Sequence, residues 1–170
     1  MIATEYITLI TTLLAVIAAV VLQRRYDIKK SQSILSIRES IMLTDFPILT
    51  FNNNGYRLRF LLDTGSNANM IDKNILKNLV ITDSSSPEED DYTVHSIGDS
   101  TLSSTQYLIC FNYDSLKFGA YFMAVDKFSG FDKIKNDTGV EVNGILGAPF
   151  MTRYKYILDL DNLKVRINKR

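Results

Sequence analysis

Hydrophobic and polar positions divide the chain into an apolar N-terminal run and a longer part in which short apolar stretches alternate with polar turns. From Ile7 to Leu22 no residue is charged, and extending the run back to Ile2 adds only Glu5. A helix needs roughly 20 mostly apolar residues to cross a bilayer. We therefore expect residues 1–25 to form a transmembrane anchor. A buried core helix is the alternative interpretation of this run.

The charges on either side of the apolar run predict its orientation. A cleaved signal peptide carries positive charge before its apolar region. Here the order is reversed, because the acidic Glu5 precedes the run and four basic residues follow it: Arg24, Arg25, Lys29 and Lys30. Positive charge next to a membrane segment resists translocation, so these residues are expected to stay in the cytoplasm. The pattern predicts a single-pass membrane protein with a cytoplasmic C-terminal domain.

The pattern changes at residue 46. Residues 26–45 are polar and mixed without a clear period, and we interpret them as a juxtamembrane tether. Beyond them, short strands separated by turns are typical of a mainly-β domain, expected over residues 46–170. The first strand is predicted over residues 46–51, followed by Asn-Asn-Asn-Gly at 52–55, which suits a tight hairpin. The return strand, residues 56–62, alternates apolar and basic side chains, as a strand with one buried face does.

The rest of the domain is expected to contain one short helix and further hairpins. Asp72 can cap a helix that runs to Leu79. Residues 84–91 combine serines with four carboxylates and indicate a solvated loop. The alternative, a calcium loop, would need alternating carboxylates and a turn glycine, which this stretch lacks. Strands are predicted over residues 92–97, 102–111 and 118–125, a helical turn over 142–151, and a last hairpin over 156–167 that turns at Asp161 and Asn162.

Composition narrows the class of protein. A chain of 170 residues with 46% hydrophobic residues fits one domain plus an appendage. Its 19 basic and 19 acidic residues cancel, so no net field would attract nucleic acid, and we expect no nucleic-acid partner. The single cysteine, Cys110, cannot form an internal disulfide. It lies in an apolar run and is predicted to be a buried structural thiol.

Asp63 follows directly on the apolar strand of residues 56–62. Leu61 and Leu62 are expected to place its carboxylate in a partly desolvated position. Two such carboxylates in contact across a two-fold axis would share one proton, so that one acts as a general base on water and the other as a general acid. A plain turn is the alternative interpretation of an isolated Asp-Thr-Gly.

The three residues after Asp63 suit such a loop. The Thr64 hydroxyl can tie the loop to a partner, and Gly65 lets the backbone approach closely. Ser66 can donate a hydrogen bond to a carboxylate.

Three segments together resemble the retropepsin-like aspartic peptidases: FLLDTGSNANMI, a flap-like hairpin around Gly98, and the later VNGILGAPFM. The resemblance covers roughly residues 46–167. Their order matches a single half-site, as in the homodimeric members of the family. The resemblance implies a closed β-barrel with one short helix, formed as a homodimer that acts on polypeptides without a metal or organic cofactor.

The resemblance also implies roles for particular residues. Asp63 is expected to be the catalytic carboxylate, with Thr64 and Gly65 as the supporting loop. Ser66 and the flap residues Ile97, Gly98 and Asp99 are expected to bind substrate, with the flap closing over an extended peptide.

The sequence departs from the viral members of this family at the dimer contact. Viral enzymes commonly carry an acidic residue after the catalytic loop and an arginine after the later glycine, which pair and brace the dimer. The corresponding residues here are Asn67 and Ala148, and Gly98 stands alone where viral flaps are richer in glycine. A different dimer brace is implied. The C-terminal part is closer to cellular and bacterial members, including the eukaryotic DNA-damage-inducible type.

Two further residues receive structural interpretations. His95, the only histidine, is expected to be a strand side chain, because no serine or cysteine nucleophile motif accompanies it. Asp159 lacks the Thr-Gly that would shape a catalytic loop and is expected to serve a turn. The sequence thus predicts a membrane-anchored aspartic endopeptidase. An inactive peptide-binding module of the same fold and a purely structural membrane protein are the alternatives.

Overall fold

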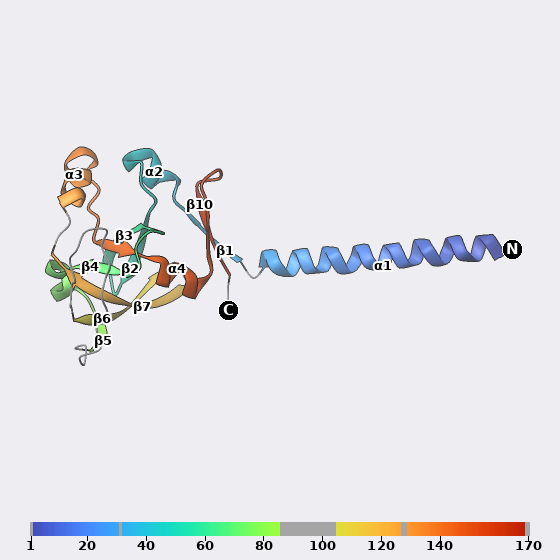
Figure 1. Ribbon diagram of the computed structural model, residues 1–170, viewed down its shortest axis with the longest axis horizontal. Coiled ribbons are helices and arrows are strands. Elements are labelled where there is room, and N and C mark those ends of the chain that lie inside the picture. The colour runs from blue at the N-terminus through green and yellow to red at the C-terminus, as the bar shows by residue number, and fades with distance from the viewer. Residues whose placement is uncertain (1, 31, 86–104, 127–128, 169–170) are drawn as a thin grey trace.

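The computed structural model describes residues 2–30, 32–85, 105–126 and 129–168. A long helix, α1 (Ile2–Lys30), projects from a β-rich domain that holds both sheets and the shorter helices (Figure 1). Within the described ranges, no helix combines the length and hydropathy expected of a membrane-spanning segment. The predicted transmembrane span is therefore not confirmed.

The segment expected to be a tether is instead largely folded onto the domain. Residues 32–44 form β1 (Gln32–Ser36) and α2 (Arg38–Thr44), and Leu35 and Ile37 are buried in the main core. Strand β1 pairs antiparallel with β10 (Lys164–Asn168), which pairs with β9 (Tyr156–Asp159) in a three-stranded sheet. Leu35, Ile37 and the partly buried Ile41 are the apolar residues of this segment that pack on the core, and they are too few to reveal a period in the sequence.

A larger sheet of seven strands forms the barrel. Its order is β2-β3-β8-β4-β7-β6-β5, and an additional pairing between β2 and β6 closes it. The mainly-β closed barrel predicted from the sequence is confirmed. The strands are β2 (Ile48–Asn53), β3 (Tyr56–Leu62), β4 (Met70–Asp72), β5 (Ile81–Ser85), β6 (Gln106–Tyr113), β7 (Leu116–Val125) and β8 (Gly144–Leu146).

Aromatic side chains fill the interior of the barrel. Phe60 on β3 stacks on Phe122 of β7 with ring centroids 5.0 Å apart, and Phe51 meets Phe111 edge-on at 4.9 Å. Phe60 alternates with outward-facing arginines along β3, as predicted for a strand with one buried face. The buried rings anchor β3, and with it the residues that follow its end.

The domain contains more helix than the one short helix expected. The predicted helix after Asp72 is the 3₁₀-helix η1 (Lys73–Asn78), whose first turn is capped by the Asp72 carboxylate at 2.8 Å from Asn74 N. Helix α3 (Ser129–Thr138) was not predicted. The helical turn predicted over residues 142–151 is in part strand β8 and in part the start of helix α4 (Ala148–Tyr154). Helix α3 is polar apart from Phe131 and Ile134, whose side chains are buried in a second hydrophobic cluster. Its sequence therefore resembles that of a loop.

Two predicted turns are confirmed. Asn54 and Gly55, between β2 and β3, have φ angles of 48° and 94°, the left-handed conformation of a tight hairpin. Asp159 serves the β9–β10 turn, where its Oδ1 accepts hydrogen bonds from the Asn162 side chain at 2.8 Å and backbone N at 3.1 Å. The Asn162 side-chain bond is the largest cause that holds the pKa of Asp159 below its usual value, and the charges of Arg166 and Lys164 also lower it.

The prediction for Cys110 is wrong. Its side chain is exposed on the outward face of β6, between the buried Ile109 and Phe111. Side chains alternate along a strand, so a residue between two core positions must point outward even when it is apolar itself.

Candidate active site

Asp63 stands at the end of β3, half-buried, at one end of the barrel. Its backbone N donates to Leu146 O of β8 at 3.1 Å, and Gly65 N donates to its Oδ1 at 2.9 Å. Within the described residues, Oδ2 of Asp63 accepts no hydrogen bond. The loop therefore orients the carboxylate through one oxygen and leaves the other open to a water or a second carboxylate.

Strand β8 pairs with the strands on both sides of this loop and so holds the loop in place. It runs parallel to β3, pairing Leu62 with Leu146, and antiparallel to β4, pairing Ile71 with Gly144. A Cβ at Gly144 would overlap the carbonyl O of Met70, so a glycine is needed for β8 to pass this close to β4. The predicted VNGILGAPFM segment does lie beside the Asp63 loop, as a strand followed by helix α4.

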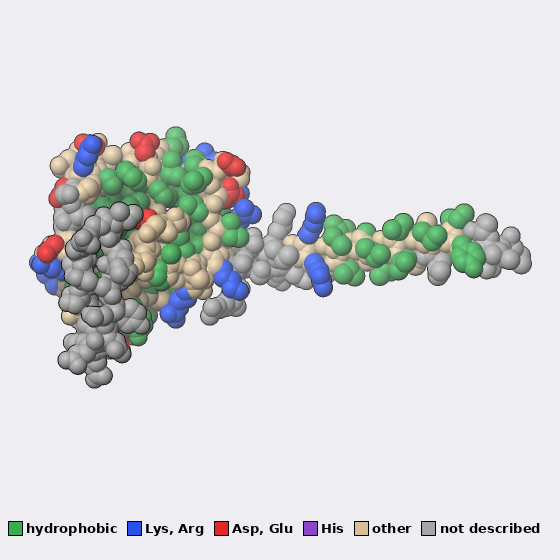
Figure 2. All heavy atoms as spheres, viewed as in Figure 1, with side chains coloured by type: hydrophobic (Ala, Val, Ile, Leu, Met, Phe, Trp, Pro, Cys, Tyr) green, Lys and Arg blue, Asp and Glu red, His purple; other side chains and the backbone are tan. Residues whose placement is uncertain are grey.

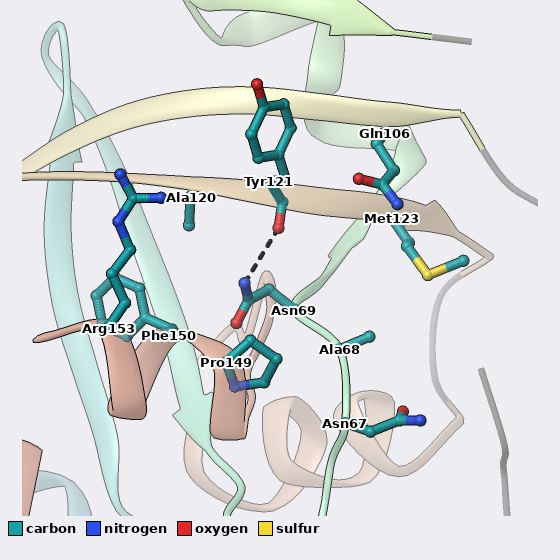
Figure 3. Close-up of a pocket in the computed structure, with 10 residues that line it drawn as sticks. All are labelled: Asn67, Ala68, Asn69, Gln106, Ala120, Tyr121, Met123, Pro149, Phe150 and Arg153. Atoms are coloured by element: carbon teal, nitrogen blue, oxygen red, sulfur yellow. Dashed lines mark hydrogen bonds between the residues drawn. The ribbon is translucent and has the colours of Figure 1, made fainter. Parts of the chain in front are cut away.

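The end of β8 is tied directly to the loop that follows Asp63. Ala148 N donates to Ser66 O at 2.8 Å, and Gly147 N donates to the side-chain Oδ1 of Asn69 at 3.0 Å. Asn69 is buried, and its amide also donates to Tyr121 O of β7 at 3.1 Å (Figure 3). One side chain thus satisfies buried backbone groups on two elements, and it links the loop to both.

A second buried amide, Asn143, positions β8 against β3. Its Oδ1 accepts from Arg59 N at 2.8 Å, and its own N donates to Arg59 O at 2.7 Å. The carbonyl of Asn143 accepts from Asp72 N at 2.9 Å. Asn69 and Asn143 were not predicted as site residues. The sequence did carry a signal for both, because each asparagine stands next to apolar strand residues. A polar side chain in such a position is buried and needs hydrogen-bond partners.

Of the remaining predicted site residues, the structure describes those of the loop after Asp63 but not those of the flap. Thr64 and Gly65 are exposed beside Asp63, and the Thr64 hydroxyl forms no hydrogen bond with any described residue. Ser66 differs from the prediction, because its hydroxyl donates to Ala68 O at 2.8 Å and not to a carboxylate. The flap residues Ile97, Gly98 and Asp99 lie outside the described residues, as does His95, so their predicted roles remain predictions.

An open cleft of about 310 Å³ lies next to the Asp63 loop (Figure 3). The loop after Ser66 forms one wall, strands β6 and β7 another, and helix α4 the third. Asp63 itself does not line it, so the cleft adjoins the carboxylate without containing it. The lining residues are Asn67, Ala68, Asn69, Gln106, Ala120, Tyr121, Met123, Pro149, Phe150 and Arg153.

No protein-family model and no curated protein sequence matches this chain. Among solved structures, it is similar to the retroviral protease-like domain of Ddi1 from Leishmania major, at 11% identity over 69% of this chain and 86% of that chain, with a TM-score of 0.42. It is also similar to a retropepsin-like aspartic protease from Rickettsia conorii, at 12% identity over 81% of this chain and 91% of that chain, with a TM-score of 0.43.

Both structures are retropepsin-like, the class that the sequence resembles.

Proposed function

We propose that this protein is an aspartic endopeptidase of the retropepsin type, in which two copies of Asp63 meet in a homodimer. The observation that carries the proposal is the Asp63 carboxylate itself. It lies at the end of an apolar strand, is oriented by Gly65 N at 2.9 Å, and has its second oxygen open within the described part of the chain. That arrangement suits a group that needs a partner across a two-fold axis.

The chemistry assigned to the pair is general acid–base catalysis. The ionised Asp63 takes a proton from a water molecule as the water oxygen attacks the peptide carbonyl carbon. The partner's Asp63, which is protonated, donates its proton to the carbonyl oxygen. When the tetrahedral intermediate collapses, the carbon–nitrogen bond breaks and the leaving nitrogen receives a proton from the first Asp63. A hydroxyl of the intermediate returns its proton to the partner's Asp63, so that a carboxylic acid is released and the pair regains its starting protonation. The exposed Thr64 hydroxyl remains available to bind the partner's loop.

The lining of the cleft beside the loop favours a polypeptide as the substrate. Its walls combine apolar side chains with the amides of Asn67 and Gln106, a mixture suited to one side chain of an extended chain. A peptide that crosses Asp63 could lie along the loop of residues 67–69 and place a side chain there.

A second candidate is a module of the same fold that binds peptides without cleaving them. A peptide with a statine-like hydroxyl in place of the scissile bond separates the two, because a working pair of carboxylates binds a transition-state mimic at least about 100-fold more tightly than the parent peptide. We expect that preference in the full chain, measured by titration calorimetry in detergent. Equal affinity for mimic and parent peptide would favour the binding module.

We further propose that α1 anchors the protein to a membrane, with the peptidase domain on the cytoplasmic side. The large apolar side chains of the helix, among them Leu14, Ile17 and Val21, are exposed (Figure 2). Basic residues follow this apolar stretch at Arg24 and Arg25, toward the domain. Apolar side chains exposed all around a helix favour a lipid environment, and the basic residues favour the cytoplasm.

Membrane extraction tests this anchoring. The full chain is expected to stay with the membrane fraction through washes with high salt and alkaline carbonate. Ile17→Arg should release it, because a charge in the middle of an apolar helix costs several kcal/mol in lipid. Arg24→Ala is the matched control outside the apolar run and should stay bound. Release of the unaltered chain by alkaline carbonate would contradict the proposal.

A further inference from the structure

Phe46 lies at the end of the barrel that carries Asp63. The β2–β3 register pairs Ile48 with Leu61, and Leu62 N donates to Pro47 O at 2.9 Å. Phe46 comes one residue before Pro47 and Asp63 one residue after Leu62, so both flank this bonded pair on the same side. Phe46 is 42% exposed in the described part of the chain.

Two further apolar side chains are exposed on the same segment. Met42 is 75% exposed and Leu43 is 55% exposed, both on α2. Their outward direction is fixed because Thr44 turns inward, donating to Ser40 O at 2.7 Å and accepting from Phe46 N at 3.2 Å. These bonds hold Phe46 against the end of α2. We call Met42, Leu43 and Phe46 the α2 patch; hydrophobic side chains gather around α2 on the face shown in Figure 2.

The surroundings of Asp63 offer little charge with which to brace a dimer. Residues 64–72 contain one further charged residue, Asp72, which is buried and caps η1, and residues 142–151 contain none. The positions that carry a bracing ion pair in viral enzymes are Asn67 and Ala148 here, and the backbone N of Ala148 is already bonded to Ser66 O. Neither of these two described segments, residues 64–72 and 142–151, offers an exposed charge for an ion pair between copies.

We propose that the α2 patch is the dimer brace: it packs against the second copy of the chain and brings the two Asp63 carboxylates together. This inference rests on the proposed function, because it requires that two Asp63 residues meet. If they meet, the two-fold axis passes within a few ångströms of each carboxylate. Phe46, which flanks the bonded Leu62 and Pro47 on the side of Asp63, then lies near the contact, and an isologous interface presents the same patch from both copies.

The position of the patch favours a second copy over other occupants. Isolated exposed apolar side chains are ordinary on protein surfaces. Met42, Leu43 and Phe46 fall within five residues of one another, all exposed, at the end of the barrel that carries Asp63. Hot spots of protein interfaces are few and lie near the centre of the contact, where large side chains are fully desolvated.

Sedimentation equilibrium of the full chain in detergent tests the brace. Phe46→Ser is expected to raise the dimer dissociation constant by at least about 30-fold, which is the effect of losing one interface hot spot. The figure is a lower bound because the substitution removes the Phe46 ring from both copies in the dimer. Val80→Ser is the matched control. Val80 is 51% exposed and sits near the opposite end of β3, where its backbone bonds to Asn53 are unaffected by the side chain. Val80→Ser should dimerise like the unaltered chain.

Cross-linking gives a second measurement that does not depend on weakening the fold. In a Cys110→Ser background, Phe46→Cys should form a covalent dimer with a bis-maleimide of reach on the order of 15 Å, since the brace places each Phe46 close to the two-fold axis. Val80→Cys should not. The background substitution is needed because Cys110 is exposed.

The outcomes separate this inference from the proposed peptidase activity. An unaltered dimer in Phe46→Ser, absence of the cross-link, or a chain that stays monomeric at every concentration would overturn the brace. Dimers that depend on Phe46 in a protein that never cleaves peptides would support the brace and overturn the peptidase. Cleavage by a dimer that is indifferent to Phe46→Ser would do the reverse.

Discussion

Asp63→Asn is expected to lower kcat/KM for peptide cleavage at least about a thousandfold, because an amide cannot accept the proton of the attacking water. The fold should be unaffected. Asn is nearly isosteric, and its Oδ1 can still accept the hydrogen bond that Gly65 N donates at 2.9 Å. Peptidase assays and thermal unfolding of the same preparations measure both effects. Asp137→Asn, an exposed carboxylate on α3, is the matched control and should retain activity.

Mixing experiments sharpen this prediction. If the active site needs two intact Asp63 residues, an equal mixture of unaltered and Asp63→Asn chains retains only about a quarter of the dimers fully active after exchange. Independent monomers would retain half of the activity. Cleavage that survives Asp63→Asn, or activity that follows the monomer expectation, would refute the catalytic pair.

Gly147→Ala is expected to destabilise the domain by about 3 kcal/mol or more, at the upper end for inserting a methyl group into a packed site. The new methyl would overlap the carbonyl O of Ala68 and lie 2.7 Å from that of Ser66. Both neighbours are backbone atoms of the loop after Asp63, so they cannot move without displacing it. The φ of Gly147 is −87°, which any residue can adopt, so the effect is steric.

Gly130→Ala is the control for this substitution. Gly130 lies in α3, and a Cβ there would meet nothing within 4 Å. Alanine is the better helix former, so Gly130→Ala should stabilise the domain by up to about 1 kcal/mol. Urea unfolding of the variants measures the difference. Equal stability of Gly147→Ala and the unaltered chain would show that the loop after Asp63 is not packed as tightly as the structure indicates.

The sequence predicted the parts of the fold whose signal is local. Strand β3 has the predicted bounds because its alternation of apolar and basic residues is strong, and the turn at Asn54 and Gly55 uses residues selected for positive φ. The position of Asp63 at the end of β3 follows from the same strand. The cap at Asp72 was likewise visible from a single residue type before an apolar run.

The parts that were missed depend on contacts between distant residues. Strand β1 is short and becomes a strand only by pairing with β10, more than a hundred residues later, in the register that sets Leu35 opposite Val165. The role of Asn69 depends on Gly147 and Tyr121, which approach it only in the folded chain. No periodicity within either segment carries that information.

The pairing of β1 with β10 has a consequence for dissecting the protein. A shortened chain that starts at residue 46, where the sequence pattern predicts that the domain begins, would lack a whole strand of the three-stranded sheet. It would leave one edge of β10 bare and remove Leu35 and Ile37 from the main core. The segment next to the helix is thus a structural part of the β-rich domain, and a minimal folded fragment has to begin ahead of Gln32.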